Sequence, residues 1–193
     1  MITFFNNIDQ TILFFIQTNY HSPILNKVMI LFTAAGDKGF VWILISLLFL
    51  INKKTRYIGI VTLGALVLTT IAGEGILKHI IQRPRPYADF PSIHLLIGKS
   101  TTYSFPSGHT TSSFAAAYVL SKYLKKFSLL IWIVAITIAF SRLYLFMHYP
   151  SDVVAGIVLG LICGKVVLNM YEHKFKNKHL IENKQNKIEI NGM

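Results

Sequence analysis

Three short polar segments hold the residues of this chain that are best suited to acid–base or nucleophilic chemistry. They are residues 78–86 (KHIIQRPRP), 106–109 (PSGH) and 141–152 (SRLYLFMHYPSD). Each adjoins an apolar run long enough to be a membrane helix, where charged groups are costly and usually mark function. Together the segments supply cations that can hold a phosphate, two histidines and a carboxylate. We therefore interpret them as parts of one active site.

The PSGH segment has the pattern of a helix start that binds an anion. Ser107 is suited to cap the helix that follows, which leaves the backbone N–H groups of Gly108 and His109 at a positive helix end. Such an end binds phosphate, and Gly108 lets an oxyanion approach the backbone. His109 can donate a proton near neutral pH. A simple Pro-Ser-Gly turn with an interfacial histidine is the alternative explanation.

The third segment pairs a histidine with a carboxylate. Ser151 is expected to begin the last helix after Pro150, which places Asp152 in its first turn, close to His148. A carboxylate bound to one imidazole nitrogen fixes the tautomer and leaves the other nitrogen free to attack. A helix-capping Asp beside an interfacial His is the alternative. Arg142 favours the active site, because it ends an apolar run and needs an anionic partner.

The first segment offers cations for phosphoryl oxygens. Lys78 and Arg85 flank the end of an apolar run, and an arginine presents a bidentate fork to phosphate. We assign Lys78 and Arg85 to phosphate binding; the neighbouring Arg83 could also surround a phosphoryl group, and its role stays open. The alternatives are a lysine that extends to the membrane interface and a Lys78 charge balanced by Glu74, one helical turn earlier.

Composition places these segments in an integral membrane protein. The 193 residues are 53% hydrophobic and 14% charged, with a mean hydropathy of +0.51. The net charge of +11 raises the question of a nucleic-acid partner, but the basic residues lie between apolar runs and form no stripe. Inner loops that contact anionic lipid explain the excess better. Acidic residues away from the termini are few and well separated, which argues against a carboxylate-bound metal.

The apolar runs predict an all-α, polytopic membrane bundle of five to six transmembrane helices, preceded by an amphipathic N-terminal helix. That first helix, over residues 1–19, is expected at the membrane interface with its apolar face formed by Phe4, Phe5, Ile8, Ile12, Phe15 and Ile16. A short helix over residues 24–35 follows, too short to cross alone. Spans are predicted at residues 40–51, 57–77, 107–124, 127–147 and 153–171.

The loops complete this picture. Residues 87–104 are expected to form a partly ordered loop over the site, and residues 172–193 a polar, basic and frayed tail outside a membrane domain of residues 1–171. The turns at 53–56 and 122–126 and the tail hold most of the free cations, which predicts that they are cytoplasmic. Alternating spans then bring all three polar segments to the outer face of the cell membrane, with the C-terminus in the cytoplasm.

The combined pattern resembles the three-part signature of the type-2 phosphatidic acid phosphatase family, membrane lipid phosphatases that share their site with vanadium haloperoxidases. It reads Lys-x6-Arg-Pro, then Pro-Ser-Gly-His, then Ser-Arg-x5-His-x3-Asp. The matching positions are Lys78, Arg85, Pro86, Pro106, Ser107, Gly108, His109, Ser141, Arg142, His148 and Asp152. The match covers every motif position in the family's order.

The resemblance implies a role for each residue. His148 is expected to be the nucleophile that forms a phosphohistidine, with Asp152 orienting it. His109 is expected to protonate the leaving oxygen and then activate a water molecule. The phosphate oxygens are expected to be held by Lys78, Arg85, Ser107, Gly108 and Arg142. The family needs no metal and no other cofactor.

The resemblance also implies a lipid phosphate or diphosphate substrate. Similar bacterial members convert undecaprenyl diphosphate into undecaprenyl phosphate and so recycle the cell-wall carrier. Others act on phosphatidylglycerol phosphate, phosphatidic acid or lipid A phosphates with the same motifs. Some carrier-specific members have Asp where this chain has Gly108. An anion transporter is the non-enzymatic alternative, but it predicts cations spread through the bilayer depth.

Overall fold

The computed structural model describes the backbone of residues 2–191 and the side chains of residues 7–174. Every regular element in this part of the chain is helical, which confirms the predicted all-α membrane bundle. Within the described residues, four helical segments are long and apolar enough to cross a membrane: Pro23–Ile51, Arg56–Asp89, Lys125–Tyr144 and Pro150–Lys174. Large apolar side chains on their outer faces are exposed, as contact with lipid tails requires; examples are Ile24, Leu31, Ile51, Leu129 and Met170.

The first crossing segment joins two helices that the sequence analysis treats separately. α2 (Pro23–Gly36) starts after Ser22, whose hydroxyl accepts a hydrogen bond from the Leu25 N–H. It passes through the short 3-10 helix η1 (Asp37–Gly39) into α3 (Phe40–Ile51). The kink falls at Lys38 and Gly39, both with positive φ, and no loop separates the two helices. The prediction that residues 40–51 alone form a span is therefore wrong, because residues 24–35 belong to the same span.

The second segment leads into the first polar segment. α4 (Arg56–Thr69) continues as the π-helical η2 (Thr70–Leu77) and then as α5 (Lys78–Ile81). π-Helical turns occur frequently at functional sites. Gln82, with φ 49°, ends α5, and the short helix α6 (Pro86–Asp89) starts after a non-helical run.

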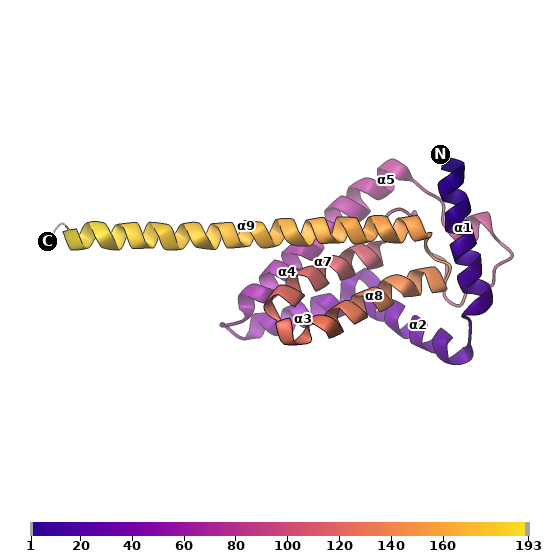
Figure 1. Ribbon diagram of the computed structural model, residues 1–193, viewed down its shortest axis with the longest axis horizontal. Helices are drawn as coiled ribbons and strands as arrows, with labels where there is room; N and C mark the ends of the chain where they lie inside the picture. The colour runs from indigo at the N-terminus through magenta and orange to yellow at the C-terminus, as the bar shows by residue number, and fades with distance from the viewer. Residues whose placement is uncertain (1, 192–193) are drawn as a thin grey trace.

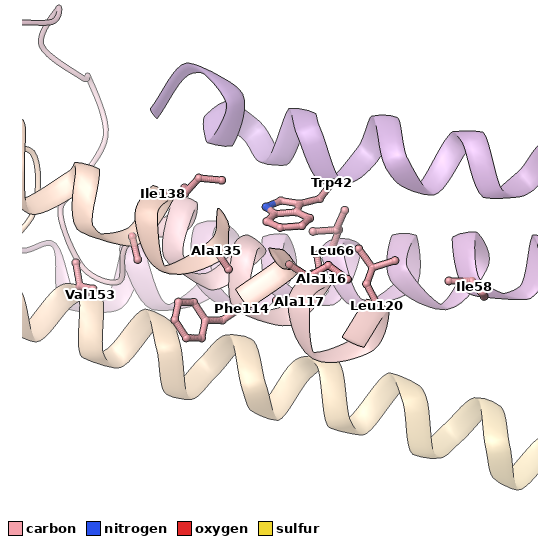
Figure 2. Close-up of a cluster of buried hydrophobic side chains, with 12 residues drawn as sticks. Trp42, Ile58, Leu66, Phe114, Ala116, Ala117, Leu120, Ala135, Ile138 and Val153 are labelled. Carbon is pink, nitrogen blue, oxygen red and sulfur yellow. The ribbon is translucent and has the colours of Figure 1, made fainter. Parts of the chain in front are cut away.

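α7 (Gly108–Tyr123) is the central helix of the bundle and packs against α4, α8 and α9. η3 (Lys125–Phe127) connects it to α8 (Ser128–Tyr144). Figure 2 shows side chains of several helices meeting around α7, with the Trp42 ring of α3 pointing towards it. The Trp42 indole N–H donates to the Ser113 hydroxyl at 2.9 Å, so this buried polar pair is satisfied.

Close packing between α7 and α9 (Pro150–Asn191) fixes the start of both helices. A Cβ atom at Gly160 would lie 2.5 Å from the Thr111 carbonyl oxygen, and one at Gly156 would lie 3.0 Å from the Ser107 carbonyl oxygen. Small residues let helix backbones approach this closely in membranes. As a result, the Ser107 N–H donates to the Asp152 carbonyl at 3.1 Å. The second and third polar segments are therefore joined directly.

The helix α1 (Ile2–Asn19) lies across the end of the bundle where α9 starts (Figure 1). Of its predicted apolar face, Ile8, Ile12 and Phe15 are exposed by 39–55%, whereas Ile16 is buried. Phe4 and Phe5 fall outside the described side chains. The face that packs inward carries Asp9, Leu13 and Ile16, spaced as one helical stripe. An exposed apolar face is consistent with a helix at the membrane interface, which stays a prediction.

The tail differs from its prediction. α9 continues as helix to Asn191 and projects beyond the bundle (Figure 1), where the sequence analysis expects frayed chain. Residues 172–191 contain no glycine or proline, and they include five Lys and three Glu residues, which are good helix formers. Continuation of a helix that is already nucleated within the bundle explains this result.

Candidate active site

The three polar segments meet at the end of the bundle that α1 covers. Topology explains this meeting, because α5 ends there, α7 and α9 start there, and α8 ends there (Figure 1). Six of the predicted site side chains are at most 6% exposed: Lys78, Arg85, Ser107, Arg142, His148 and Asp152. Gly108 and His109 are partly exposed. The structure thus brings together residues that are up to 74 positions apart in sequence (152 − 78).

The 87–104 loop holds Arg85 in place. The Arg85 guanidinium donates through Nε to the Thr102 carbonyl at 2.8 Å and through Nη1 to the Met147 carbonyl at 3.1 Å. The same Nη1 lies 3.3 Å from Nε2 of His148. Carbonyl acceptors fix the fork without neutralising it, so the positive charge of Arg85 remains available beside His148.

Lys78 lies next to the start of α7. Its Nζ is 2.8 Å from both carboxylate oxygens of Glu74 and 3.3 Å from the Thr102 hydroxyl. The Glu74 carboxylate also reaches the helix start, because a Cβ atom at Gly108 would lie 2.3 Å from its Oε1. A carboxylate thus lies between the lysine and the N-terminus of α7, the position that suits an anion. The Glu74 side chain is 41% exposed, so it has room to leave.

Arg142 has only part of its hydrogen-bonding capacity used. Its Nη1 donates to the Thr33 hydroxyl of α2, and its Nε is buried without a partner among the described residues. Buried donors without partners are costly, and a guanidinium binds oxyanions strongly. Arg142 therefore has both the free donor and the charge that a phosphate oxygen requires.

The His148 ring separates the cations from a carboxylate. Its Nε2 faces Arg85, whereas its Nδ1 lies 3.4 Å from the Ser104 hydroxyl and 3.7 Å from Oδ2 of Asp152. Ser104 donates to that same Oδ2 at 2.5 Å and so links the two residues. At 3.7 Å the expected direct His148–Asp152 hydrogen bond is not formed, and the Ser104 hydroxyl, which sequence reasoning does not single out, connects the two residues instead.

Burial sets the charge state of His148. The ring is 1% exposed, and its loss of hydration lowers the pKa of His148 to about 3, with Asp152 opposing the effect and Arg85 and Arg142 adding to it. His148 is therefore a neutral imidazole at physiological pH. A neutral imidazole has a free electron pair on one nitrogen, which a nucleophile requires.

His109 and Ser107 differ in detail from expectation. Nε2 of His109 lies 3.1 Å from the Thr33 carbonyl, and the ring packs against α2 near Gly36. His109 thus contacts α2. It still lies at the same end of the bundle as Arg142 and His148, close enough to interact electrostatically with both. Ser107 precedes α7 as its N-cap, as predicted. Its hydroxyl, however, accepts from the Thr110 hydroxyl at 2.9 Å and caps no backbone N–H.

Two further charged residues join the site: Arg83, whose role the sequence leaves open, and Asp9, which the sequence does not single out. Nη1 of Arg83 is 2.7 Å from Oδ1 of Asp152, and Nη2 is 2.7 Å from Oδ2 of Asp9. The signal for Asp9 was present in its spacing with Leu13 and Ile16, which places a carboxylate on the inward stripe of α1. For Ser104 no comparable signal exists, since a serine in a polar loop is unremarkable.

Comparison with known proteins agrees with this geometry. The family model described as "PAP2 superfamily" matches residues 56–176, which include all three polar segments. The undecaprenyl-diphosphatase of Sulfolobus acidocaldarius is 34% identical over 156 residues, which cover 80% of this chain and 75% of that protein.

Solved structures show the same arrangement of helices. The PAP2-type phosphatidylglycerolphosphate phosphatase from Bacillus subtilis superposes with a TM-score of 0.70 at 27% identity, covering 87% of this chain and 86% of that one. A bacterial vanadium-dependent iodoperoxidase shares the fold, with a TM-score of 0.67 at 16% identity over 84% of this chain and 48% of that one. Sequence match, superposed helices and the assembled motif residues all agree, and the chain belongs to the PAP2 superfamily.

Proposed function

We propose that this PAP2 enzyme is a metal-independent membrane lipid phosphatase that converts undecaprenyl diphosphate into undecaprenyl phosphate through a phosphohistidine. The environment of His148 carries the proposal: a buried neutral imidazole with Nε2 beside Arg85 and Nδ1 towards Ser104 and Asp152. A histidine that accepts a phosphoryl group needs cations beside the attacking nitrogen and a carboxylate near the other nitrogen, and His148 has both. The similarity to an undecaprenyl-diphosphatase supports the substrate.

In the first step, the electron pair of His148 Nε2 attacks the terminal phosphorus. The bond from that phosphorus to the bridging oxygen breaks, and His109 gives its proton to the departing oxygen. Asp152, with Ser104, holds the Nδ1–H that becomes more acidic as the ring gains positive charge. Lys78, Arg85 and Arg142 stabilise the phosphoryl oxygens, and the Gly108 N–H at the start of α7 adds its dipole, with Ser107 beside it.

In the second step, His109 takes a proton from a water molecule as that water attacks the phosphohistidine. The P–N bond breaks, its electron pair returns to His148 Nε2, and inorganic phosphate is released. His109 therefore ends each cycle in the protonation state in which it began. Its contact with the Thr33 carbonyl fixes the orientation of the ring for both transfers.

The proposal places the site at the outer face of the cell membrane, with the C-terminus in the cytoplasm. The turn between α3 and α4 and the turn between α7 and α8 lie at the opposite end of the bundle from the site (Figure 1). Both carry Lys or Arg residues, as cytoplasmic turns do. A site at this depth lets a prenyl or acyl tail stay in the bilayer while the phosphate enters, and residues 1–171 then form the membrane domain.

Phosphatidylglycerol phosphate is the second candidate substrate, favoured by the superposition on a phosphatidylglycerolphosphate phosphatase. Phosphatidic acid and lipid A phosphates carry the same reacting group. The test is phosphate release by the purified protein in detergent with EDTA, with each of these lipids compared with undecaprenyl diphosphate. His148→Ala serves as the blank, and His94→Ala in the exposed loop as the matched control.

The highest kcat/KM is expected for undecaprenyl diphosphate, with EDTA leaving the rate unchanged. A higher kcat/KM for phosphatidylglycerol phosphate would make that lipid the preferred substrate and leave the proposed mechanism unchanged. Turnover in His148→Ala equal to that of the wild type would overturn the mechanism.

A further inference from the structure

The structure assigns two positioning residues to this site: we infer that Asp9 of α1 and Arg83 hold Asp152 in the orientation that serves His148. The inference rests on the proposed phosphohistidine mechanism and deepens it. It makes the N-terminal helix, which precedes the region matched by the family model, a part of the catalytic apparatus.

Arg83 is the link in this arrangement. Its fork binds Oδ1 of Asp152 through Nη1 and Oδ2 of Asp9 through Nη2, each at 2.7 Å. Its guanidinium carbon lies 4.0 Å from the centre of the Tyr149 ring, next to His148 in sequence. Two carboxylates and one aromatic face fix the guanidinium plane, which a flexible lysine would not reproduce.

Asp9 is as firmly held as Arg83. It is 3% exposed, and its Oδ1 accepts the Ser151 N–H at 2.9 Å. The Ser151 hydroxyl binds its other oxygen. Asp9 therefore occupies the N-terminus of α9, where the first backbone N–H groups lack helical partners. It ties α1 to the residue that precedes Asp152.

As a result, the two carboxylate oxygens of Asp152 have different partners. Oδ1 is taken by Arg83, while Oδ2 receives the Ser104 hydroxyl at 2.5 Å and the Tyr149 N–H at 2.9 Å on the His148 side. Without Arg83, Oδ1 would lose the hydrogen bond that holds it, and the carboxylate could rotate away from His148. A buried ion pair is weak evidence for stability, so a role in orienting the carboxylate accounts for it better.

The outward face of α1 is apolar. Ile8, Ile12 and Phe15 are exposed and suited to contact lipid, whereas Asp9 on the opposite side reaches Arg83. One short helix thus connects a lipid-facing surface with the carboxylate that orients the nucleophile. Loss of the Asp9 contact is expected to slow the chemical step and leave phosphate binding intact.

The test uses Asp9→Asn, which keeps the size of the side chain and an acceptor for the Ser151 N–H but removes the charge beside Arg83. Wild type and variants are mixed in excess over labelled undecaprenyl diphosphate, and the single-turnover rate constant and amplitude of phosphohistidine formation are measured. The expected rate constant is about 10-fold lower than wild type, by analogy with the loss seen when residues that orient metal ligands from outside the coordination shell are replaced. The amplitude is expected to be unchanged.

Three further variants sharpen the result. Arg83→Gln is expected to lower the rate constant at least as much, and the double variant no further, because both residues act through the same contact. Glu172→Gln also removes one carboxylate, at an exposed position of α9 near Tyr123, the last residue of α7, and is expected to match the wild type.

A wild-type rate constant in Asp9→Asn would overturn the inference. So would a lower amplitude with an unchanged rate constant, since a purely structural role reduces the folded fraction only. Additive losses in the double variant would also contradict it. If the wild type forms no more phosphoenzyme than His148→Ala, the proposed function itself is wrong, which distinguishes the two failures.

Discussion

Replacement of Arg142 by methionine is expected to make the protein more stable and inactive. Arg142 is 5% exposed, carries a charge near Arg85, and has an Nε without a partner among the described residues. Leaving one buried donor unpaired costs about 1–3 kcal/mol. Methionine has similar length and no polar group, so Arg142→Met is expected to recover about that much.

For a chain of this size, a gain of that magnitude raises the melting temperature by about 2–12 °C. Cys163 supplies the assay, because it is the single cysteine and is 3% exposed. A dye that becomes fluorescent on reaction with a thiol reports unfolding in detergent as the temperature rises. Lys53→Met, at an exposed position, is the matched control and is expected to melt with the wild type.

The same variant is expected to lose function. Removal of one donor to a developing oxyanion typically lowers kcat by about 10²–10³. Inorganic phosphate at 100 times its Kd is expected to stabilise the wild type by about 2.7 kcal/mol and Arg142→Met much less. A lower melting temperature in Arg142→Met, or near-normal turnover, would refute the idea that Arg142 keeps its Nε unpaired in order to bind phosphate.

Three further predictions concern the scaffold and the two residues of the nucleophilic pair. Gly160→Val is expected to abolish folding, because its Cβ would lie 2.5 Å from the Thr111 carbonyl oxygen; a monodisperse, active variant in size-exclusion chromatography would contradict this close packing. Asp152→Asn is expected to lower kcat by about 10³–10⁴ with little change in KM, by favouring the wrong His148 tautomer, and steady-state kinetics check it. Acid is expected to destabilise the protein through His148. Burial lowers its pKa to about 3, so the unfolded chain binds a proton below about pH 6.5 that the folded chain refuses. The free energy of unfolding then falls as the pH drops from about 6.5 towards 3, by at most about 1.4 kcal/mol per unit. Melting curves at pH 7 and 5 are expected to show a smaller acid shift in His148→Gln, and equal shifts would count against the buried neutral ring.

The assembly of the three polar segments could be predicted from the sequence because it follows from topology. Apolar runs of membrane length alternate in direction, so the start of α7 and α9 and the ends of α5 and α8 meet without any knowledge of packing. Motif spacing then identified Lys78, Arg85 and His148 as neighbours. The structure adds distances and partners to an arrangement that hydropathy already required.

The role of α1 could not be predicted in the same way. Hydrophobic periodicity identifies an apolar face, but in a membrane protein that face can contact lipid as well as protein. Ile12 and Phe15 of that face are exposed in the structure, and the spacing of Asp9 with Leu13 and Ile16 is recognisable as an inward stripe only once their burial is known. In the sequence, Asp9 is one of the acidic residues near the chain ends. Its partner, Arg83, lies 74 residues away (83 − 9), so no local pattern connects the two.

The contacts of Ser104 and the joint between α2 and α3 could not be predicted from the sequence either. Ser104 links Asp152 and His148 because a loop without regular structure happens to carry it into the site. The joint at Lys38 and Gly39 depends on positive φ values, which allow α2 to continue into α3. Hydropathy interprets the polar Asp37 and Lys38 as a break, so the two halves of the first crossing segment seemed separate.

The most direct test of the mechanism is to trap the covalent intermediate. Purified protein is mixed with undecaprenyl diphosphate labelled at its terminal phosphate, quenched within a turnover, and digested for mass spectrometry of the peptide that contains residues 141–152. Phosphate on His148 of the wild type, absent from His148→Ala, is the predicted result. Phosphate on another residue, or turnover without any phosphoenzyme, would contradict the assignment of His148 as the nucleophile.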